Sequence, residues 1–537
     1  MNMVSPPSEE QLPSNTTETP ARISQPLPQN ETIINEPNYN YTDPVTTTSS
    51  LNNARETSFV VETNLYSAIV SNLNGGSFAS FVLKNYKATD STSVQLVDNL
   101  NKNNLLFQSM SIEGLSLNLN NLWDFVGRPY DLHVDTGPET VKFSTVIEGK
   151  TIYKSLTFNP GSYEINVSFD LSNIKDELSQ GVYTLSWSGG LPTTEKNLKD
   201  ELFYYKAYAY QGDELSSEKL RSGKTLAENY RGRTSWVATR NKYFLAALIS
   251  TESGVGASLG GSFEDESPKF DISITQQVNS SNSFTLYLGP LEYDNVASVG
   301  VNLEKSMSMG FSLIRPISRG VLSALTAMHK FIPNYGVVLI IFSILVKLVV
   351  YPLTRKSYQS MRAMSSLQPK LQALKEKHAK DPQKLNKATM ALYKEEGVNP
   401  MGGCLPMLIQ MPLLFALFQV FRSTIELRGE PFMLWITDLS APDTLFEIGG
   451  FPVNILPLVM AASMFIQQKM TPTAAGAGQQ KSMMYFMNIF FIFIFYRLPS
   501  GLNLYYTLFN VLTILQQKYL TPHQQPAAIP AVKTKKK

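Results

Sequence analysis

Five apolar segments in the C-terminal part of this 537-residue chain constrain its fold more than any other feature. Each is close to the roughly 20 residues that an α-helix needs to cross the hydrocarbon core of a bilayer. Buried helices of a soluble domain are the alternative, but five such segments in succession favour an α-helical membrane core. The expected spans are residues 335–354, 405–423, 451–468, 482–498 and 502–520.

The distribution of charge predicts how such a core is oriented. Residues 336–537 contain 21 Lys and Arg against 9 Asp and Glu, a net +12, whereas residues 1–335 contain the remaining 25 and 35, a net −10. Loops rich in Lys and Arg stay in the cytoplasm. We therefore expect the basic connection 355–400 and the lysine-rich tail 521–537 on the cytoplasmic side, and the acidic loop 424–450 on the outer side.

The residues before the first span are of a different kind. Residues 1–54 are rich in Pro, Ser, Thr, Asn and Glu and lack apolar runs, which predicts a disordered tether. Residues 55–307 alternate apolar and polar side chains between turn sequences, which predicts a large all-β sandwich domain. Within it, residues 175–178 and 215–220 are expected to form short helices. The alternation is clearest at Tyr163, Ile165, Val167, Phe169 and Leu171.

Five spans with a cytoplasmic C-terminus place this β domain outside the cytoplasm. A domain of this size is exported behind a signal anchor, and residues 1–54 contain no apolar run of that kind. The topology therefore predicts a sixth, N-terminal span in addition to the five seen here.

Two amphipathic segments flank the first span. Residues 312–331 repeat apolar side chains at helical spacing with basic residues between them, which is typical of a helix in the plane of a bilayer surface. Packing of this helix on the β domain is the alternative. In residues 355–400, Asp381-Pro382 supplies an N-cap and a first-turn proline between two apolar stripes, the second of which ends at Gly397. This pattern predicts a basic helical hairpin that binds either anionic lipid or a protein partner. The first stripe is Met361, Met364, Leu367, Leu371, Leu374 and His378.

The composition argues against cofactor chemistry. A single cysteine, Cys404, excludes an intrachain disulfide and a cysteine zinc site, and the four histidines lie far apart in the sequence. The sequence contains no phosphate-binding P-loop, dinucleotide-binding or calcium-loop motif. We therefore expect no cofactor and no metal ion.

Lys347 is the residue most indicative of function, because it lies inside the apolar run of the first span, eight residues before Arg355. That spacing corresponds to about 12 Å along a helix. The side chain therefore either reaches the cytoplasmic boundary or occupies a polar site within the membrane. Ser343 lies one turn away on the same helical face. Polar residues of other spans either bond between helices or line a cavity with Lys347. The candidates for such a cavity are Gln410, Tyr505, Tyr506 and Asn510.

Two other functions fit parts of this pattern. Ser343 and Lys347, at positions i and i+4, have the spacing of a serine–lysine hydrolase pair. A polar cavity in a membrane bundle is also found in solute transporters, although the sequence shows neither inverted repeats nor paired broken helices.

A series of short motifs runs through the C-terminal half. They are Tyr351-Pro352-Leu353-Thr354, Leu367-Gln368-Pro369-Lys370, Asn399-Pro400-Met401-Gly402-Gly403-Cys404-Leu405-Pro406, Trp435-Ile436-Thr437-Asp438-Leu439-Ser440 and Pro499-Ser500-Gly501-Leu502-Asn503-Leu504-Tyr505-Tyr506. In this order they closely resemble the YidC family of membrane-protein insertases. Gly75-Gly76 and Gly289-Pro290-Leu291 extend the resemblance over the β domain.

The resemblance implies a multidomain, multi-pass protein of the cell inner membrane. A periplasmic all-β supersandwich would precede an α-helical five-span transmembrane core with a cytoplasmic helical hairpin. The core would enclose a hydrophilic groove in which Lys347 matches a positive residue that is usually arginine. Ser343 and Tyr506 match family positions that contact clients.

The resemblance also implies partners and a function. The partners would be nascent membrane-protein clients, the lipid bilayer, the Sec translocon and, through the basic cytoplasmic loop and tail, the ribosome. The function would be to insert, fold and help assemble integral membrane proteins, alone or with the Sec translocon. We expect no covalent catalysis, so the chain would not be an enzyme.

Overall fold

The computed structural model describes residues 55–88, 91–98, 103–127, 130–264, 266–279, 281–398, 405–470, 486 and 488–520. The expected tether and basic tail lie outside the described residues, as do the beginning of the expected span 482–498 and residues 399–404 of one motif.

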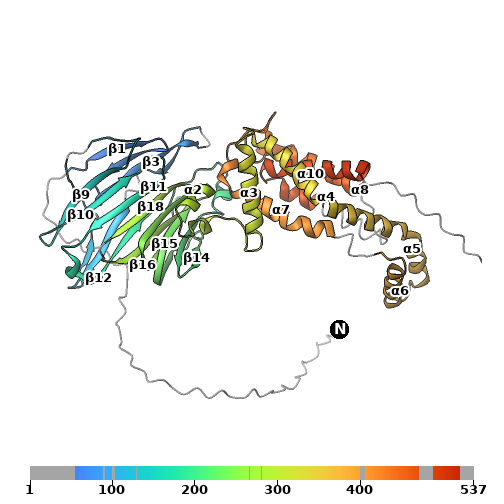
Figure 1. Ribbon diagram of the computed structural model, residues 1–537, viewed down its shortest axis with the longest axis horizontal. Coiled ribbons are helices and arrows are strands. Elements are labelled where there is room, and N and C mark those ends of the chain that lie inside the picture. Colours follow the sequence, from blue (N-terminus) through green and yellow to red (C-terminus); the bar gives the residue numbers. More distant parts are fainter. Residues whose placement is uncertain are drawn as a thin grey trace, which may run out of the picture. The chain divides into compact units, whose positions relative to one another are not determined.

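A smaller and a larger β-sheet make up the N-terminal domain (Figure 1). The smaller sheet has the strand order β4-β3-β2-β1-β8, and only its β1–β8 pair is parallel. Its strands are β1 Ser58–Thr63, β2 Tyr66–Ser71, β3 Ser77–Lys87, β4 Ser93–Val97 and β8 Leu132–Val134.

The larger sheet has the order β6-β5-β12-β17-β16-β18-β11-β10-β9-β7, and β15, β13 and β14 branch from β16. Its strands are β5 Asn104–Ser111, β6 Ser116–Asn118, β7 Asp124–Phe125, β9 Glu139–Ile147, β10 Lys150–Phe158, β11 Glu164–Asp170, β12 Leu178–Trp187, β13 Lys206–Gln211, β14 Glu214–Glu218, β15 Leu226–Arg240, β16 Phe244–Glu264, β17 Ser267–Gln277 and β18 Ser283–Pro290. Short helices connect or follow them: η1 Lys175–Glu177, α1 Leu198–Glu201, α2 Tyr293–Ser298 and η2 Leu303–Ser306.

The alternating segment of the sequence forms β11, as predicted. Ile165, Val167 and Phe169 are buried between the more exposed residues of the strand. The expected helix at 175–178 appears as the 3-10 turn η1, but the expected helix at 215–220 is wrong. Those residues belong largely to β14, because Leu215 pairs with Tyr210 of β13 and tertiary pairing overrides a weak local preference.

Gly75 and Gly76 mark a place where the backbone approaches the core closely. Both have positive φ, at 65° and 104°. A Cβ on Gly76 would lie 2.6 Å from Leu156 Cδ1, and a Cβ on Gly75 would lie 2.8 Å from the Trp123 ring. Only glycine fits both the conformation and the space.

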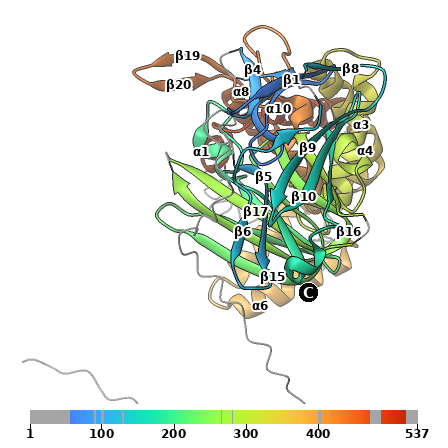
Figure 2. The same ribbon diagram turned by 90° about the vertical axis from the view of Figure 1, so that its left-hand side faces the viewer.

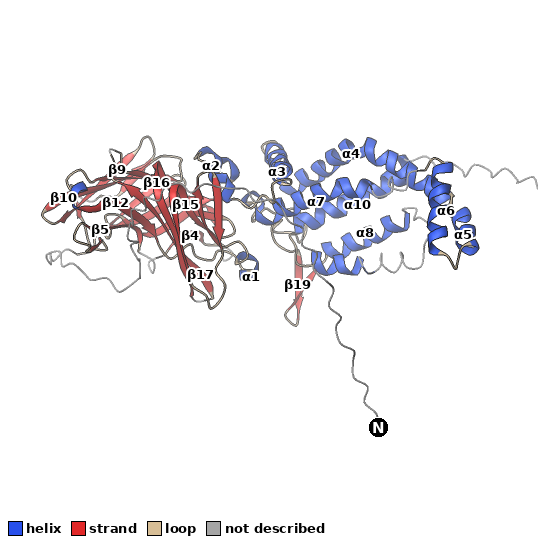
Figure 3. Cartoon of the chain, turned by 90° about the horizontal axis from the view of Figure 1, so that it is seen from below, coloured by secondary structure: helices blue, strands red, loops and turns tan. Residues whose placement is uncertain are grey.

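The helices after the β domain are α3 Arg315–His329, α4 Tyr335–Ser366, α5 Gln368–Lys377, α6 Pro382–Glu395, α7 Leu405–Ser423, η4 Ile425–Leu427, α8 Leu456–Met470, α10 Ser500–Leu515 and the π-helical turn Gln516–Leu520. Residues 488–495 are also helical. Helix α10 contacts α4, α7 and α8, and Figure 3 shows these helices running side by side. Among the described residues, α4 is the one helix long and apolar enough to cross a membrane by length and composition.

Helix α4 is longer than the expected span 335–354. The Asn334 side chain accepts a hydrogen bond from Val337 N at 3.1 Å and caps its start. The helix then continues through Pro352 to Ser366. The helix thus extends beyond the residues of the expected span, because one interior proline costs a hydrogen bond without ending a long helix that packs on its neighbours.

The expected amphipathic segment 312–331 forms α3. Its buried residues Val321, Leu322 and Leu325 lie on the face through which α3 packs against α7 and α4. Arg319 of the same helix lies 3.7 Å from the Glu304 carboxylate and over the Tyr293 ring, so α3 also contacts the last residues of the expected β domain.

The basic connection forms the helix pair α5 and α6, with a break at Leu367 that splits the first expected stripe between α4 and α5. Asp381 caps α6 by accepting from Lys384 N at 3.0 Å, and Pro382 is its first residue, as predicted. Gly397, with φ 64°, follows the end of α6.

The third expected span does not begin as a helix. Residues 451–454 form strand β20 Phe451–Asn454, which pairs with β19 Thr444–Ile448, and α8 starts only at Leu456. A run of apolar residues does not by itself distinguish a strand from the start of a span.

Candidate functional site

Helix α4 directs Lys347 towards α10. The side chain is only 8% exposed, and its Nζ donates a hydrogen bond to Thr513 Oγ1 at 2.7 Å. Nζ also lies 4.3 Å from the centre of the Phe509 ring, a cation–π contact. Lys347 is therefore held in a site between two helices and does not extend to solvent.

Thr513 was not among the residues singled out from the sequence. Its hydroxyl donates to Phe509 O at 2.7 Å and accepts from Lys347, so both its hydrogen-bonding roles are used. The available signal was periodicity, since Asn503, Asn510 and Thr513 recur on α10 at intervals of seven and three residues.

Ser343 is fully buried, but its hydroxyl donates to Leu339 O of its own helix at 2.7 Å. Lys347 Nζ is bonded to Thr513 instead. The two side chains thus form no hydrogen-bonded nucleophile–base pair, which argues against the serine–lysine hydrolase.

Tyr505 and Gln410 lie near one another between α10 and α7. The Tyr505 ring is buried beside Phe342 of α4, with ring centres 6.2 Å apart, and the Gln410 amide interacts with the Tyr505 hydroxyl without the geometry of a hydrogen bond. Tyr506 is half-buried, and its ring meets Phe495 edge-on at 5.4 Å. Gln410 Nε2 and both tyrosine hydroxyls are buried without a hydrogen bond to any part of the chain that the structure describes.

Asn510 faces a different neighbour. Its Nδ2 donates to Ser463 Oγ of α8 at 3.1 Å, whereas Thr513 faces α4. A second polar pair, Gln468 and Asn488, exchanges two hydrogen bonds of 2.8 and 2.7 Å between α8 and the helix 488–495. The six candidates therefore do not form one cluster. Lys347 and Tyr505 lie along the α4–α10 contact, and Ser343 is buried on α4. Gln410 adjoins Tyr505 from α7, Tyr506 packs on Phe495, and Asn510 bonds to α8.

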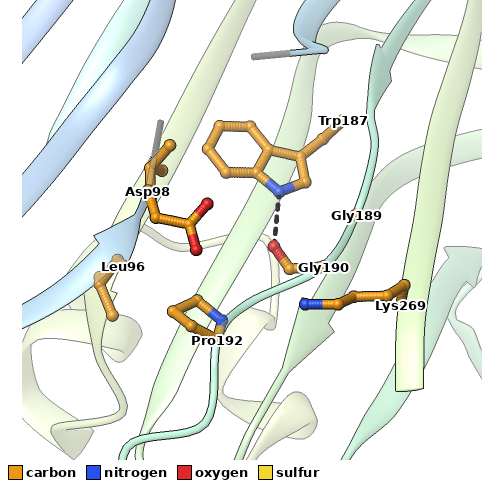
Figure 4. A pocket seen from close by; sticks show the side chains of 8 residues that line it. Leu96, Asp98, Trp187, Gly189, Gly190, Pro192 and Lys269 are labelled. Carbon is orange, nitrogen blue, oxygen red and sulfur yellow. Dashed lines mark hydrogen bonds between the residues drawn. The ribbon is translucent and has the colours of Figure 1, made fainter. Parts of the chain in front are cut away.

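The β domain offers no comparable site among its described residues. A small cavity of about 20 Å³ lies next to Trp187, whose Nε1 donates to Gly190 O at 3.2 Å. Figure 4 shows the residues that line it. That volume suits about one water molecule. The described residues also contain no group of His, Cys, Asp and Glu able to hold a metal ion.

Comparisons with known sequences identify both halves of the chain. The family described as the YidC periplasmic domain matches residues 58–318, and the family described as the 60Kd inner membrane protein matches residues 327–527. A membrane protein insertase YidC of Chlorobium luteolum is 39% identical over 494 residues, which cover 88% of this chain and 84% of that protein. One from Pelodictyon phaeoclathratiforme is 35% identical over 99% of this chain and 93% of that protein. The chain belongs to the YidC family.

A solved structure of an active YidC insertase, with its first transmembrane domain resolved, is 20% identical to this chain. The structural match spans 87% of this chain and 93% of the solved chain, with a TM-score of 0.37.

Membership of the YidC family confirms the coarse architecture expected from the motifs: a β-rich YidC periplasmic domain followed by the helical inner-membrane-protein domain. It also confirms an inner-membrane protein and a non-enzymatic class.

Proposed function

We propose that this chain inserts, folds and helps assemble integral membrane proteins at the inner membrane. In this proposal the hydrophilic flank of a client enters the polar site around Lys347, while its apolar segment passes into lipid. The observation that carries it is a buried amine bonded to a side-chain hydroxyl of another helix, in a bundle that exposes large apolar side chains and buries several polar ones.

The polarity of the bundle supports a multi-pass topology. Val349 of α4 is 78% exposed and Phe493 is 80% exposed, while Asn503, Thr513 and Ser343 are buried. Large exposed apolar surfaces are rare on soluble proteins, and buried polar side chains bond helices together in membranes. We infer that α4, α7, α8, the helix that includes 488–495, and α10 with its π-helical turn are the five spans.

The charge distribution supports the orientation. We propose that α5 and α6 and the C-terminus are cytoplasmic and that the β domain is periplasmic, because basic loops remain in the cytoplasm. In this orientation α3 lies along the outer surface of the membrane.

Lys347 is suited to attracting a client without holding it permanently. Its charge favours a flank that carries carboxylates, and the Thr513 hydroxyl is a neutral acceptor that a carboxylate can replace, because charge-assisted hydrogen bonds are the stronger kind. Buried polar atoms normally have a partner, and those of Tyr505, Tyr506 and Gln410 offer bonds to a polar flank. Burial of the client's apolar segment in lipid then supplies the driving force.

The α5–α6 pair is proposed as the contact for cytoplasmic partners, the ribosome and the Sec translocon among them. It contains an open cavity of about 430 Å³ between its helices. The lining residues are Lys370, Ala373, Leu374, Lys377, Ala388, Ala391, Leu392 and Glu395. Alanine and leucine side chains together with two lysines suit a partner that combines apolar and acidic groups.

Site-specific photocrosslinking to a stalled nascent membrane protein tests the insertion site. A photoreactive phenylalanine replaces Tyr506, which has a similar ring, and in a matched control it replaces Val511, an exposed residue of the same helix. We expect client adducts from position 506 well above those from position 511. Equal yields at the two positions, or adducts from 511 alone, would contradict a client path along this site.

A further inference from the structure

A β-hairpin interrupts the loop before α8. Strands β19 and β20 are joined by Gly449 and Gly450, whose φ values of 58° and 79° are those of a tight type I′ turn. Figures 2 and 3 show the hairpin projecting from the helices next to it. A hairpin of two strands is at best marginally stable in water on its own.

The register separates the side chains of the hairpin into two faces. Phe446 lies opposite Val453, Ile448 opposite Phe451, and Glu447 opposite Pro452. Because opposite residues share a face and neighbours alternate, one face carries only apolar side chains. The only charged residue of the two strands, Glu447, is on the other face.

No part of the chain that the structure describes covers this apolar face fully. Phe446 is 49% exposed, Ile448 65% and Phe451 58%. The two strands also form a sheet of their own, so each has one edge that pairs with no other described strand.

The base of the hairpin is tied to the ends of two helices. Asp443 Oδ2 accepts hydrogen bonds from Leu456 N at 2.6 Å, Ile455 N at 3.0 Å and Trp435 Nε1 at 3.1 Å. Strand β20 is attached to the end of the helix 488–495, because Tyr496 OH donates a hydrogen bond of 2.6 Å to Pro452 O.

Two further contacts complete this attachment. Asn454 Nδ2 donates to Tyr496 O at 2.6 Å, and the Phe451 ring stacks on the Tyr496 ring with centres 5.5 Å apart. These contacts fix the position of the exposed face relative to α8 and the helix 488–495.

We propose that the apolar face of the β19–β20 hairpin rests on lipid at the outer boundary of the bilayer, with Glu447 in water. The placement of the hairpin on the outer side of the membrane rests on the proposed function, whereas the apolar character of its face does not. Lipid is the proposed partner of this face because the hairpin leads directly into α8, where Leu458 and Val459 are exposed. Exposed apolar surface thus continues from the hairpin to the proposed span.

The position at the boundary follows from the same residues. Tyr and Trp gather at membrane–water boundaries, and Trp435 and Tyr496 are both at the hairpin's base. Unpaired strand edges are not tolerated in the hydrocarbon, and the charged face excludes full immersion. The hairpin is thus an amphipathic element that lies in the plane of the surface.

Nitroxide labels on neighbouring residues of opposite faces test this proposal. The full chain carries Cys404→Ser, which removes its single cysteine, and receives one new cysteine by Ile448→Cys or Glu447→Cys. Val459→Cys on α8 is the control for the span. Each labelled protein is reconstituted in vesicles of phosphatidylethanolamine and phosphatidylglycerol, and collisions with oxygen, which favours lipid, and a water-soluble nickel chelate are compared.

We expect the label at 448 to show a several-fold higher ratio of oxygen to nickel collisions than the label at 447. Equal ratios at positions 447 and 448, together with a label at 459 that reports lipid, would overturn the hairpin proposal. The assignment of α8 as a span would then still hold. Protection of position 448 from both reagents would mean that protein covers the face, which also overturns the proposal. A label at 459 that reports water would overturn the proposed span and the hairpin's orientation together.

Discussion

Both halves of the molecule bury a lysine, and they treat it differently. In the β domain, Lys154 is completely buried and its Nζ donates to Asn74 O at 2.9 Å and Leu105 O at 2.8 Å. These acceptors are main-chain carbonyls, one just before β3 of the smaller sheet and one in β5 of the larger sheet. Lys154 on β10 therefore joins the two sheets and has no room to change partner.

Lys347 has the same ammonium group and an aromatic ring beside it, but its acceptor is the hydroxyl of Thr513 on another helix. A side-chain acceptor can rotate away, whereas a carbonyl in a sheet cannot. A buried lysine held by backbone carbonyls serves the fold, whereas one held by a side chain that can rotate has an acceptor that a ligand can replace.

The largest effect is expected from Lys347→Ala. Loss of the charge should reduce insertion of a client with an acidic exported tail to background, measured by protease protection of the tail in vesicles. Lys347→Arg, which keeps the charge, should retain activity. Full insertion by Lys347→Ala would show that this lysine, like Lys154, serves only the fold.

The second prediction concerns Lys154, and burial lowers the pKa of this amine from 10.5 to about 7. Between those values the unfolded chain binds more protons than the folded chain, so stability should rise with pH. We expect the melting temperature of the β domain within the full chain to increase from pH 7.5 to 9, followed by tryptophan fluorescence.

Lys154→Met has a similar volume and no titrating group, so it should remove most of this increase. Buried carboxyls such as Glu201, whose pKa is raised to about 7, and buried tyrosines such as Tyr163 and Tyr204, whose pKa values are also raised, change stability in the opposite direction. The comparison is therefore made between the unchanged protein and Lys154→Met at each pH, because both contain these groups. An unchanged pH dependence in the variant would disprove the assignment to Lys154.

A smaller effect is expected from Thr513→Val, which removes the acceptor of Lys347 at nearly constant volume. A hydrogen bond to a charged group contributes about 1.5–3 kcal/mol. We expect partial loss of insertion and a lower melting temperature of the helical part, with Thr513→Ser close to the unchanged protein. Equal behaviour of the valine and serine variants would mean that the hydroxyl does not hold Lys347.

The smallest effect is expected from Ser343→Ala, because that hydroxyl bonds only to its own helix. Insertion should remain within about twofold of the unchanged protein, because alanine removes a bond within one helix and leaves the Lys347–Thr513 bond in place. Loss of activity together with labelling of Ser343 by a fluorophosphonate would instead restore the hydrolase hypothesis.

Much of the fold could be predicted from the sequence, because periodicity records which face of an element is buried. The alternation at 163–171 predicted β11, and Asp381-Pro382 predicted the start of α6. The end of α4 could not be predicted in this way, since Pro352 and the following basic residues are also compatible with a continuing helix. Hydropathy likewise missed β20, although Gly449-Gly450 is a hairpin signal in its own right.

The candidate site was predictable in part for a similar reason. A lysine in an apolar run stands out because it is costly there. Thr513 does not stand out, because a threonine in an apolar helix usually satisfies itself by bonding to its own backbone. Only the arrangement of α4 against α10 gives this hydroxyl its second role.

The length of α4 has a mechanical consequence. Its 32 residues form one rod of about 48 Å, whereas the hydrocarbon core is about 30 Å thick. Lys347 and the start of α5 after Leu367 are thus joined by one continuous helix, in which Pro352 removes a single backbone hydrogen bond. A partner that binds α5 and α6 and tilts this end of α4 would also displace Lys347, which couples binding at the helix pair to the proposed insertion site.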